Sequence, residues 1–405
     1  MFIGWITASN LSGNGLGNEL PDLKWITFPD CPMAVRLHNR SNRAIVTCTI
    51  SVPCTRKDVI DKRMKHSERQ LSKEAPWTDL VIAVGVIAMV LGHALFPSIK
   101  TDHPASTLYI VIYWWHMPLF FIMGGLTLKP LARNWRAMWQ FVRERLLPMA
   151  STYLIAGVLL IFASHVIHGD SWGFTAHYFL RLIYGGSALN GDLTMMWFFT
   201  VMALTFLVVE LLITWTDTFT QFFIAITMFA LGISYGSVGF MGEPTTPWAA
   251  DLVLMTTLWM LCGYHGYRHY SQLKNKAFFA TAISIIFVIL AICRFEWGLN
   301  FVLYLKTHTI KTPYMAFYVP LMVALALCIM AEALYKKGWL NWLRPLSWYA
   351  VPILYMHQAV IDVLAMVPAL NHTLILWLLG VIISLLIAAG WHHLVKLVFP
   401  KLTRN

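Results

Sequence analysis

Charged residues are scarce in this chain. Only 12 % of its 405 residues are Asp, Glu, Lys or Arg, and only 19 are acidic. Ordinary soluble domains carry about 25 % charged residues, and a soluble globule of this length needs them to cover its surface. Hydrophobic residues instead make up 58 % and aromatic residues 14 % of the chain, which excludes a disordered protein as well. The composition therefore indicates a polytopic membrane protein.

Cysteine is also sparse, and its spacing carries no motif. The six Cys are scattered along the chain without a C-x-x-C pair. This pattern indicates neither a zinc site nor a disulfide framework. We therefore expect no metal cofactor.

The first 76 residues lack any apolar run of the roughly 20 residues that a bilayer requires. They also lack a secretory signal peptide, since no basic start leads into an apolar core and a cleavage site, and residues 10–18 are rich in turn formers. We expect residues 1–76 to be a cytoplasmic extension, either disordered or upstream of a native start near Met64, where a basic stretch begins. Residues 77–405 form the second expected domain.

Apolar segments and short polar loops alternate from Trp77 onward. By length and composition we count about ten membrane spans, and the expected fold is an all-α, polytopic bundle. The spans are 79–97, 108–128, 147–167, 195–214, 221–240, 249–266, 278–296, 314–334, 347–368 and 373–397.

The distribution of Lys and Arg orients these spans. Basic residues gather before the first span, in the second, sixth and eighth loops and in the tail, so both termini are expected to be cytoplasmic. The opposite loops are poor in cations, with Lys100, Lys306 and Lys311 as exceptions, and residues 168–194 there are expected to hold a short interfacial or re-entrant helix. The net charge of +11 is therefore a topology signal, and we expect the lipid bilayer of a bacterial inner membrane as a partner, not nucleic acid.

Two histidines lie at similar depth in consecutive antiparallel spans. His93 lies about 14 residues into the first span, or about 21 Å from the cytoplasmic face of a core about 30 Å thick. His116 lies about 8 residues, or about 12 Å, inward from the opposite face. Ionisable groups at such depth are costly and are functional candidates. A metal is an alternative use of a His pair, but it needs a third ligand that the sequence does not identify.

Three further ionisable groups fall within the spans. Asp79 precedes His93 by 14 positions and lies within about 40° of it around the helix, so we expect it at the cytoplasmic mouth of the same lumen. His357 lies near the middle of the ninth span, and Glu210 toward the cytoplasmic end of the fourth. For His357 the alternative is a structural hydrogen bond to a neighbouring helix, and for Glu210 it is a structural role.

Five segments in order resemble the acyltransferase 3 family of integral-membrane O-acyltransferases, most closely its sugar O-acetylase-like branch. They cover the chain from about Trp77 to its end. The sequence departs from the family pattern at Ile82, where a basic residue is usual, and at Gly124, where Ser-Gly is usual in place of Gly-Gly. The segments are Asp79–His93, Trp115–Gly125, Arg143–Pro148, Trp197–Phe199 and Ser347–His357.

The resemblance implies that cytoplasmic acetyl-CoA donates an acyl group to a hydroxyl, often on an envelope carbohydrate or lipid-linked glycan. A neutral imidazole suits the general base that a hydroxyl needs. We expect His93 or His116 in that role, with the other polarising the carbonyl or aligning the acceptor; direct transfer and a covalent acetyl-histidine relay both remain open. Cytoplasmic arginines are expected to hold the CoA phosphates, or else to act in topology alone: Arg133, Arg136, Arg143 and Arg145.

Two other functional classes fit parts of the sequence. Buried His, Asp and Glu on ten spans suit a proton-coupled exporter of a polar or acylated metabolite, although no paired, broken spans mark the two halves of a transporter. A scaffold or sensor without catalysis is the third class. It predicts that His93 and His116 can both be replaced without consequence.

Overall fold

The computed structural model describes residues 35–40, 43–48, 75–234, 236 and 246–398, and the account below concerns these residues. The chain divides into two compact units, residues 1–60 and residues 61–405. In the first unit, strands β1 (Val35–Arg40) and β2 (Arg43–Cys48) pair antiparallel, with Val35 opposite Cys48. The sequence analysis did not predict this hairpin. The rest of the expected extension up to residue 74, including Met64, lies outside the described residues.

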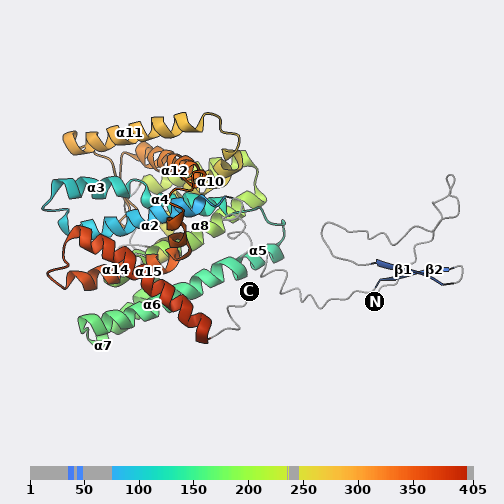
Figure 1. Ribbon diagram of the computed structural model, residues 1–405, viewed down its shortest axis with the longest axis horizontal. Coiled ribbons are helices and arrows are strands. Elements are labelled where there is room, and N and C mark those ends of the chain that lie inside the picture. Colours follow the sequence, from blue (N-terminus) through green and yellow to red (C-terminus); the bar gives the residue numbers. More distant parts are fainter. Residues whose placement is uncertain (1–34, 41–42, 49–74, 235, 237–245, 399–405) are drawn as a thin grey trace. The chain divides into compact units, whose positions relative to one another are not determined.

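The second unit is built from helices, shown in Figure 1. The α-helices are α2 (Thr78–Leu95), α3 (His103–Tyr113), α4 (His116–Leu126), α5 (Trp135–Phe141), α6 (Leu147–His168), α7 (Trp172–Tyr184), α8 (Met196–Trp215), α9 (Thr218–Ile233), α10 (Val253–Tyr270), α11 (Lys276–Trp297), α12 (Pro313–Lys336), α13 (Arg344–Trp348), α14 (Ala350–Ala365) and α15 (Thr373–Val398). The short elements are η1 (Phe96–Ser98), η2 (Val142–Leu146), η3 (Gly186–Ala188), η4 (Gly191–Leu193), η5 (Pro247–Leu252) and η6 (Asn341–Leu343), with strands β3 (Val302–Tyr304) and β4 (Thr309–Lys311).

The all-α membrane bundle expected from the sequence is confirmed. Each of the ten expected segments contains a helix, and seven helical stretches among the described residues are long and apolar enough to cross a membrane. Helices α9 and α14 are apolar but have only 16 residues each. The exact number of ten spans and the side of the termini therefore stay predictions.

Local sequence explains several helix boundaries. Asp217 begins α9 by accepting hydrogen bonds from the backbone N–H groups of Phe219 and Thr220, and Asn134 caps α5 in the same way. Gly169 ends α6 with a φ of +68°, a left-handed conformation that glycine adopts without a steric penalty.

Helix α2 is the central helix of the bundle. It contacts α3, α4, α12, α13, α14 and α15. Thirteen of its 18 residues are buried, from Thr78 to Leu95. Trp377 of α15 adds a hydrogen bond from its indole N–H to the backbone oxygen of Ile87, at 3.2 Å. A side chain on α2 therefore faces other helices over most of its circumference.

Helices α4 and α10 cross in close contact because glycines face each other there. A methyl group added at Gly263 would overlap the backbone oxygen of Ile122, and one added at Gly125 would overlap that of Met260. Small residues allow such close backbone approach between membrane helices.

Gly263→Ala is accordingly expected to destabilise the bundle by about 1–3 kcal/mol, the usual cost of overpacking. Thermal unfolding of the purified protein in detergent measures the effect as a lower midpoint. Gly266→Ala on the same helix is the matched control, because an added methyl there meets no atom within 4 Å. Equal midpoints for the two variants would contradict the close crossing.

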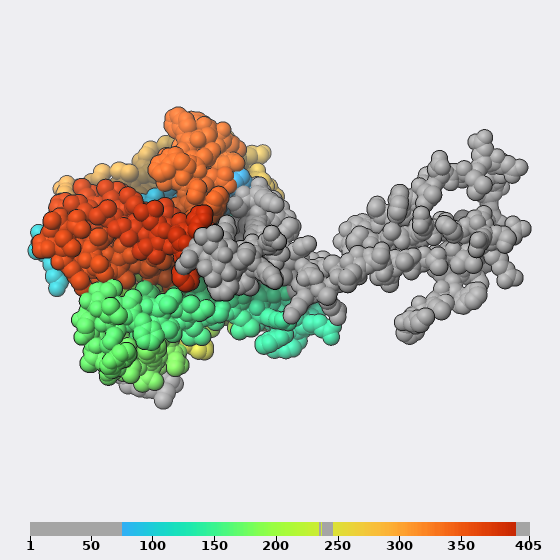
Figure 2. Space-filling view, turned by 60° about the horizontal axis from the view of Figure 1, so that its bottom comes forward, coloured from blue at the N-terminus to red at the C-terminus, as the bar shows by residue number. Residues whose placement is uncertain are grey.

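The outer surface of the unit is strongly apolar. Helices α6, α11 and α15 bury only 17 %, 11 % and 22 % of their most apolar windows, and Figure 2 shows α6 with α7 (green) and α15 (red) on one face. Exposed side chains on α6 include Ile155 and Leu159, at 61 % and 55 %. Such a surface is suited to hydrocarbon and not to water.

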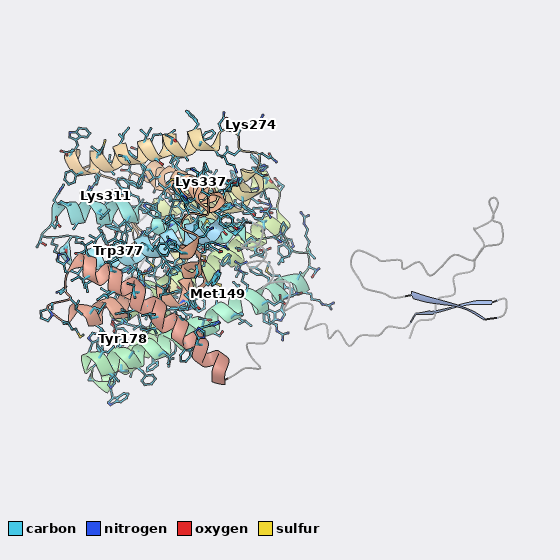
Figure 3. The ribbon with its side chains drawn as sticks, in the orientation of Figure 1. Met149, Tyr178, Lys274, Lys311, Lys337 and Trp377 are labelled. Carbon is cyan, nitrogen blue, oxygen red and sulfur yellow. The ribbon has the colours of Figure 1, made fainter. Side chains whose placement is uncertain are left out.

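Two ends of the bundle can be distinguished. We call "basic end" the one formed by the first turn of α2, the α4–α5 connection and the α10–α11 connection, where Lys129, Arg268 and Arg344 lie. We call "hairpin end" the one formed by the last turn of α2, by α7 and by the β3–β4 hairpin. Figure 3 shows Lys274 near the basic end and Lys311 and Tyr178 near the hairpin end.

The second expected span is interrupted, which the sequence analysis did not predict. It consists of α3 and α4, separated by Trp114 and Trp115. The Trp114 side chain is fully buried, and its indole N–H donates to the backbone oxygen of Phe301 at 3.0 Å, next to β3. The helix expected within 168–194 is present as α7, with Trp172 and Leu180 exposed.

Candidate active site

Three histidines from three helices converge near the hairpin end. His93 lies in the last turn of α2, His116 is the first residue of α4, and His357 lies in the middle of α14. The ring centroids of His93 and His357 are 4.9 Å apart in an edge-on arrangement. His93 also interacts electrostatically with His116, which in turn interacts with His357. The interruption between α3 and α4 places His116 at a helix start, beside the end of α2.

Backbone contacts fix the tautomers of two of these rings. His116 Nδ1 lies 2.9 Å from the Ile112 oxygen, and His357 Nδ1 lies 2.9 Å from the Ile353 oxygen. A carbonyl oxygen only accepts hydrogen bonds, so each neutral ring carries its proton on Nδ1 and leaves a lone pair on Nε2. His357 Nε2 is buried and has no hydrogen-bond partner among the described residues. It is therefore an unused base in the interior of the bundle.

Tyrosines surround the cluster on the side of the hairpin end. Tyr113 packs edge-on against His116, with ring centroids 4.6 Å apart, and contacts Tyr109 at 4.2 Å. Tyr304 on β3 lies 5.4 Å from Tyr113. A methyl group added at Gly92 would lie 3.1 Å from the Tyr113 ring, so the residue before His93 needs to be small. These rings provide hydroxyl groups and aromatic faces next to the histidines.

Lys306 is a cation that the sequence analysis noted only as a topology exception. Its ammonium group donates to the Leu189 oxygen at 2.7 Å, to Asn190 Oδ1 at 3.2 Å and to Thr194 Oγ1 at 2.5 Å. Burial lowers the pKa of Lys306 to about 8, and the group interacts electrostatically with His93. The sequence did contain one sign of its importance: Lys306 lies in a loop on the side of the membrane where the loops are otherwise poor in Lys and Arg.

The hairpin that carries Lys306 is anchored by a buried ion pair. His308 Nδ1 lies 2.8 Å from Asp251 Oδ2, and both side chains are less than 10 % exposed. Burial alone would lower the pKa of His308, but the hydrogen bonds to Asp251 and to the Gly232 oxygen outweigh it and raise the pKa. The β3–β4 hairpin is thus held against η5 and α9, beside the histidine cluster.

Asp79 and Glu210, the other two ionisable candidates, lie at the basic end. Asp79 is buried in the first turn of α2, and its Oδ2 accepts from Arg344 Nη2 at 2.8 Å. Glu210 on α8 is buried, lies 3.3 Å from the Thr214 hydroxyl and interacts with Arg145 and Arg268. Both are therefore about one helix length from the histidines, and neither contributes to their cluster.

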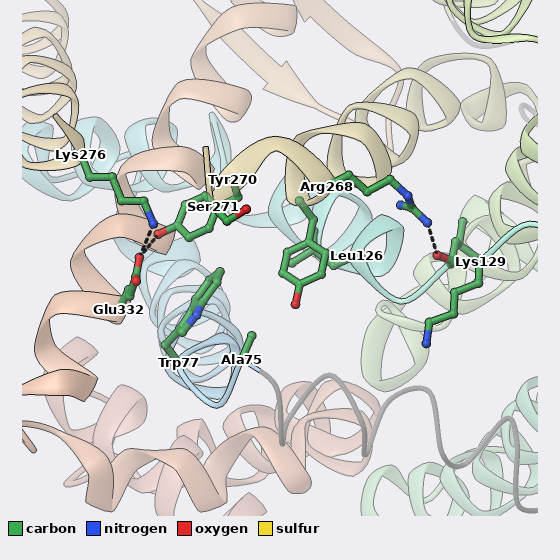
Figure 4. Close-up of a pocket in the computed structure, with 11 residues that line it drawn as sticks. Ala75, Trp77, Leu126, Lys129, Arg268, Tyr270, Ser271, Lys276 and Glu332 are labelled. Carbon is green, nitrogen blue, oxygen red and sulfur yellow. Dashed lines mark hydrogen bonds and ion pairs between the residues drawn. The ribbon is translucent and has the colours of Figure 1, made fainter. Parts of the chain in front are cut away.

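A pocket of about 460 Å³ opens at the basic end (Figure 4). Its cations are Lys129, Arg268 and Lys276, of which Lys276 pairs with Glu332 at 2.8 Å. Its aromatic walls include Trp77 and Tyr270, whose ring centroids are 5.1 Å apart. The other lining residues are Ala75, Leu126, Leu128, Tyr267 and Ser271. The sequence analysis did not single out these residues, because they come from helices distant in the chain.

The four arginines expected to hold phosphates are not gathered in one place. Arg133 donates from Nε to the Thr214 oxygen at 2.9 Å, while Arg136 and Arg143 are exposed. Arg145 points inward, donates to the Thr127 hydroxyl at 2.5 Å and stacks 3.9 Å above the Phe206 ring. None of the four lines the pocket, so a role for them with CoA stays a prediction.

Metal ligation has no candidate among the residues that the structure describes. No group of three or more His, Cys, Asp or Glu side chains there is arranged to hold an ion. Cys262 and Cys328 lie within α10 and α12 as free thiols. Imidazoles, tyrosine hydroxyls and the Lys306 ammonium are polar groups at the histidine cluster.

Comparison with protein families identifies the family of this apolar bundle. The model of the acyltransferase 3 family, described as an acyltransferase domain, matches residues 76–391. No curated protein and no solved structure matches the chain. The match covers most of the chain and nearly all of its membrane unit, from Trp77 into α15. The chain therefore belongs to the acyltransferase 3 family and is a multi-pass membrane acyltransferase.

Proposed function

We propose that this protein transfers an acetyl group from cytoplasmic acetyl-CoA to a hydroxyl of an envelope carbohydrate or lipid-linked glycan, at the inner membrane. The observation that carries the proposal is the cluster of His93, His116 and His357 inside the bundle, in a chain of an acyltransferase family. Hydroxyl groups are weak nucleophiles near neutral pH and need a positioned base to attack a thioester. Imidazole is the side chain best suited to that task.

In the proposed reaction His93 or His116 removes the proton of the acceptor hydroxyl as its oxygen attacks the thioester carbonyl. The carbon–sulfur bond then breaks, CoA leaves as a thiol that takes up the proton, and the acetyl ester forms. The remaining histidines, with their lone pairs fixed on Nε2 in the neutral rings, and the tyrosine hydroxyls align the acceptor. Lys306 adds a positive charge near His93, and this charge stabilises the negative charge that develops on the carbonyl oxygen in the transition state.

The pocket at the basic end supports a CoA donor. Its cations suit phosphate groups, and its aromatic walls suit an adenine ring. Trp77 immediately precedes α2 and His93 lies in its last turn, so the two are separated by about 24 Å along the helix. A donor with a nucleotide at one end and a thioester on a long flexible arm matches that separation. The arginines of the second loop remain proposed contacts for its phosphates.

The test follows the acetyl group itself. Membranes that contain the protein are incubated with acetyl-CoA labelled in the acetyl group, and glycan, lipid and protein fractions are counted. Label in the glycan or lipid fraction supports the proposal, and label retained on the protein as well supports an acetyl-histidine relay. Absence of transfer combined with proton-coupled flux of a metabolite in vesicles would replace the proposal with a transporter. Unchanged behaviour of His93→Ala and His116→Ala would instead favour a scaffold or sensor.

Lys129→Met is expected to weaken binding of acetyl-CoA by about 10–100-fold, because one charge-assisted contact to phosphate contributes about 1.5–3 kcal/mol. Titration of the purified protein with CoA measures the dissociation constant without any turnover. The control is Lys337→Met. Lys337 is exposed at the C-terminal end of α12 and does not line the pocket. Equal affinities of the two variants would exclude the pocket as the donor site.

A further inference from the structure

Gln358 directly follows His357 on α14 and approaches the ring of His93. Its Nε2 donates to Asp362 Oδ1 at 2.7 Å, one turn farther along the helix. Its Oε1 is buried and completes no hydrogen bond of ordinary length among the described residues. A buried amide oxygen without a partner costs free energy and calls for an explanation. The nearby imidazole of His93 provides one.

The contact to Asp362 is part of a longer polar chain. Asp362 interacts directly with Asp192 of η4. The Asp192 side chain is only 3 % exposed, and its Oδ2 lies 3.1 Å from His168 Nε2, at the end of α6. The chain thus leads from His93 on α2 through α14 and η4 to a partly exposed histidine. Its members come from distant parts of the sequence.

This chain determines which way the Gln358 amide faces. The proton that the contact between Asp362 and Asp192 requires lies between those two carboxyl groups, so Asp362 Oδ1 accepts from the NH₂ group of Gln358 and the amide oxygen points to His93. Only the protonated nitrogen of the His93 ring can then face Gln358. The other ring nitrogen carries the lone pair. The same logic holds in metal sites, where an outer partner sets the tautomer of a histidine ligand.

We propose that Gln358, held by Asp362, is a positioning residue that fixes the tautomer of His93, so that its lone pair faces the acceptor hydroxyl. The kinetic part of this inference rests on the proposed function, whereas the tautomer itself does not. The hydrogen bond to His93 closes when substrate enters, as catalytic hydrogen bonds commonly tighten in the substrate complex.

The first test is spectroscopic and needs no activity. Full-length protein labelled with ¹⁵N-histidine is purified in detergent, and the His93 resonances are identified by difference with His93→Gln. We expect a single neutral tautomer in the wild type and a mixture in Asp362→Asn, because an asparagine donates as well as accepts and allows the Gln358 amide to turn over. Unchanged His93 resonances in Asp362→Asn would overturn the proposal, even if no acetyl transfer were ever detected.

The second test is kinetic. Gln358→Met removes the amide at similar volume and is expected to lower kcat for acetyl transfer by about 10–100-fold, the usual cost of losing a partner that orients a histidine. KM for acetyl-CoA should stay within about threefold, because the donor pocket lies at the other end of α2. Combining Gln358→Glu with Asp362→Asn exchanges carboxylate and amide and restores an acceptor toward His93, so kcat should recover to within about tenfold of the wild type.

A matched control separates this role from the general loss of a buried amide. Gln221 holds His265 at 2.8 Å elsewhere in the bundle, and Gln221→Met should leave kcat within about twofold. Gel filtration and the thermal midpoint confirm that each variant is folded. Full kcat in Gln358→Met, or no recovery in the exchanged pair relative to Asp362→Asn alone, would overturn the positioning role.

Discussion

Acetyl transfer is expected to fall by about 10²–10⁴-fold in His93→Gln, the range lost when a general base is removed. Among the three histidines, His93 interacts with both of the others and with Lys306. Glutamine keeps much of the volume and the hydrogen-bonding capacity of the ring but cannot accept a proton. KM for acetyl-CoA should change little, because a change in kcat alone marks an interaction made in the transition state. Initial rates over a range of acetyl-CoA concentrations provide both values.

His165→Gln is the control for that experiment. His165 also lies within an apolar helix, α6, where its Nδ1 is 2.8 Å from the Thr175 hydroxyl. Among the described residues it lies outside the cluster of His93, His116 and His357, so its replacement should leave transfer within about twofold. A His93→Gln variant that transfers acetyl groups within tenfold of the wild-type rate would remove His93 from the chemistry and direct attention to the lone pair of His357.

Arg344→Ala is expected to lower the free energy of unfolding by about 3 kcal/mol. The reason is the buried Asp79, which would lose its ion pair with Arg344, and removal of one partner of a buried pair costs about 3–5 kcal/mol. The lower end of that range applies because the Arg344 side chain is 24 % exposed. Denaturant or thermal unfolding in detergent measures the difference.

A second ion pair at the same end offers the comparison. Lys336 is 69 % exposed and pairs with Glu332 at 2.6 Å, so Lys336→Ala should cost less than about 1 kcal/mol. Adding Asp79→Leu to Arg344→Ala removes the buried carboxylate that lost Arg344 and should recover part of the loss in the free energy of unfolding. Equal free energies of unfolding for Arg344→Ala and Lys336→Ala would contradict the prediction, because the buried pair would then contribute no more than the exposed one.

The helices of this fold could be predicted from hydropathy because a lipid environment demands apolar runs of a minimum length. The break at Trp114 and Trp115 was missed because hydropathy alone continues through both residues. Its local cause is Pro118, which has no N–H to donate to the backbone oxygen of Trp114, and the hydrogen bond from Trp114 to Phe301 holds the interruption in place. The β1–β2 hairpin was missed for a different reason: its strands are short and mixed in polarity.

The site could be predicted in part, because the number of residues from the end of a span gives the depth of a side chain in the membrane. The similar depths of His93 and His116 anticipated that the structure would bring them together. Depth contains no information about which helices are neighbours, so the direct contact of His93 with His357 did not follow from the sequence. The same limit applies to the basic pocket, because Trp77 and Tyr270 meet only through the packing of α2 near α10 and α12.

Helix lengths have a consequence for the barrier that substrates face. Helix α14, which carries His357, has 16 residues and rises about 24 Å, whereas α6 at the lipid-facing surface has 22 residues and rises about 33 Å. The hydrocarbon layer is about 30 Å thick, so α6 is long enough to cross it, whereas α14 is shorter than the layer. Polar groups cost less to move through a thinner apolar layer. Beside α14 and His357, the distance over which a polar substrate is without water is therefore shorter than the bilayer is thick.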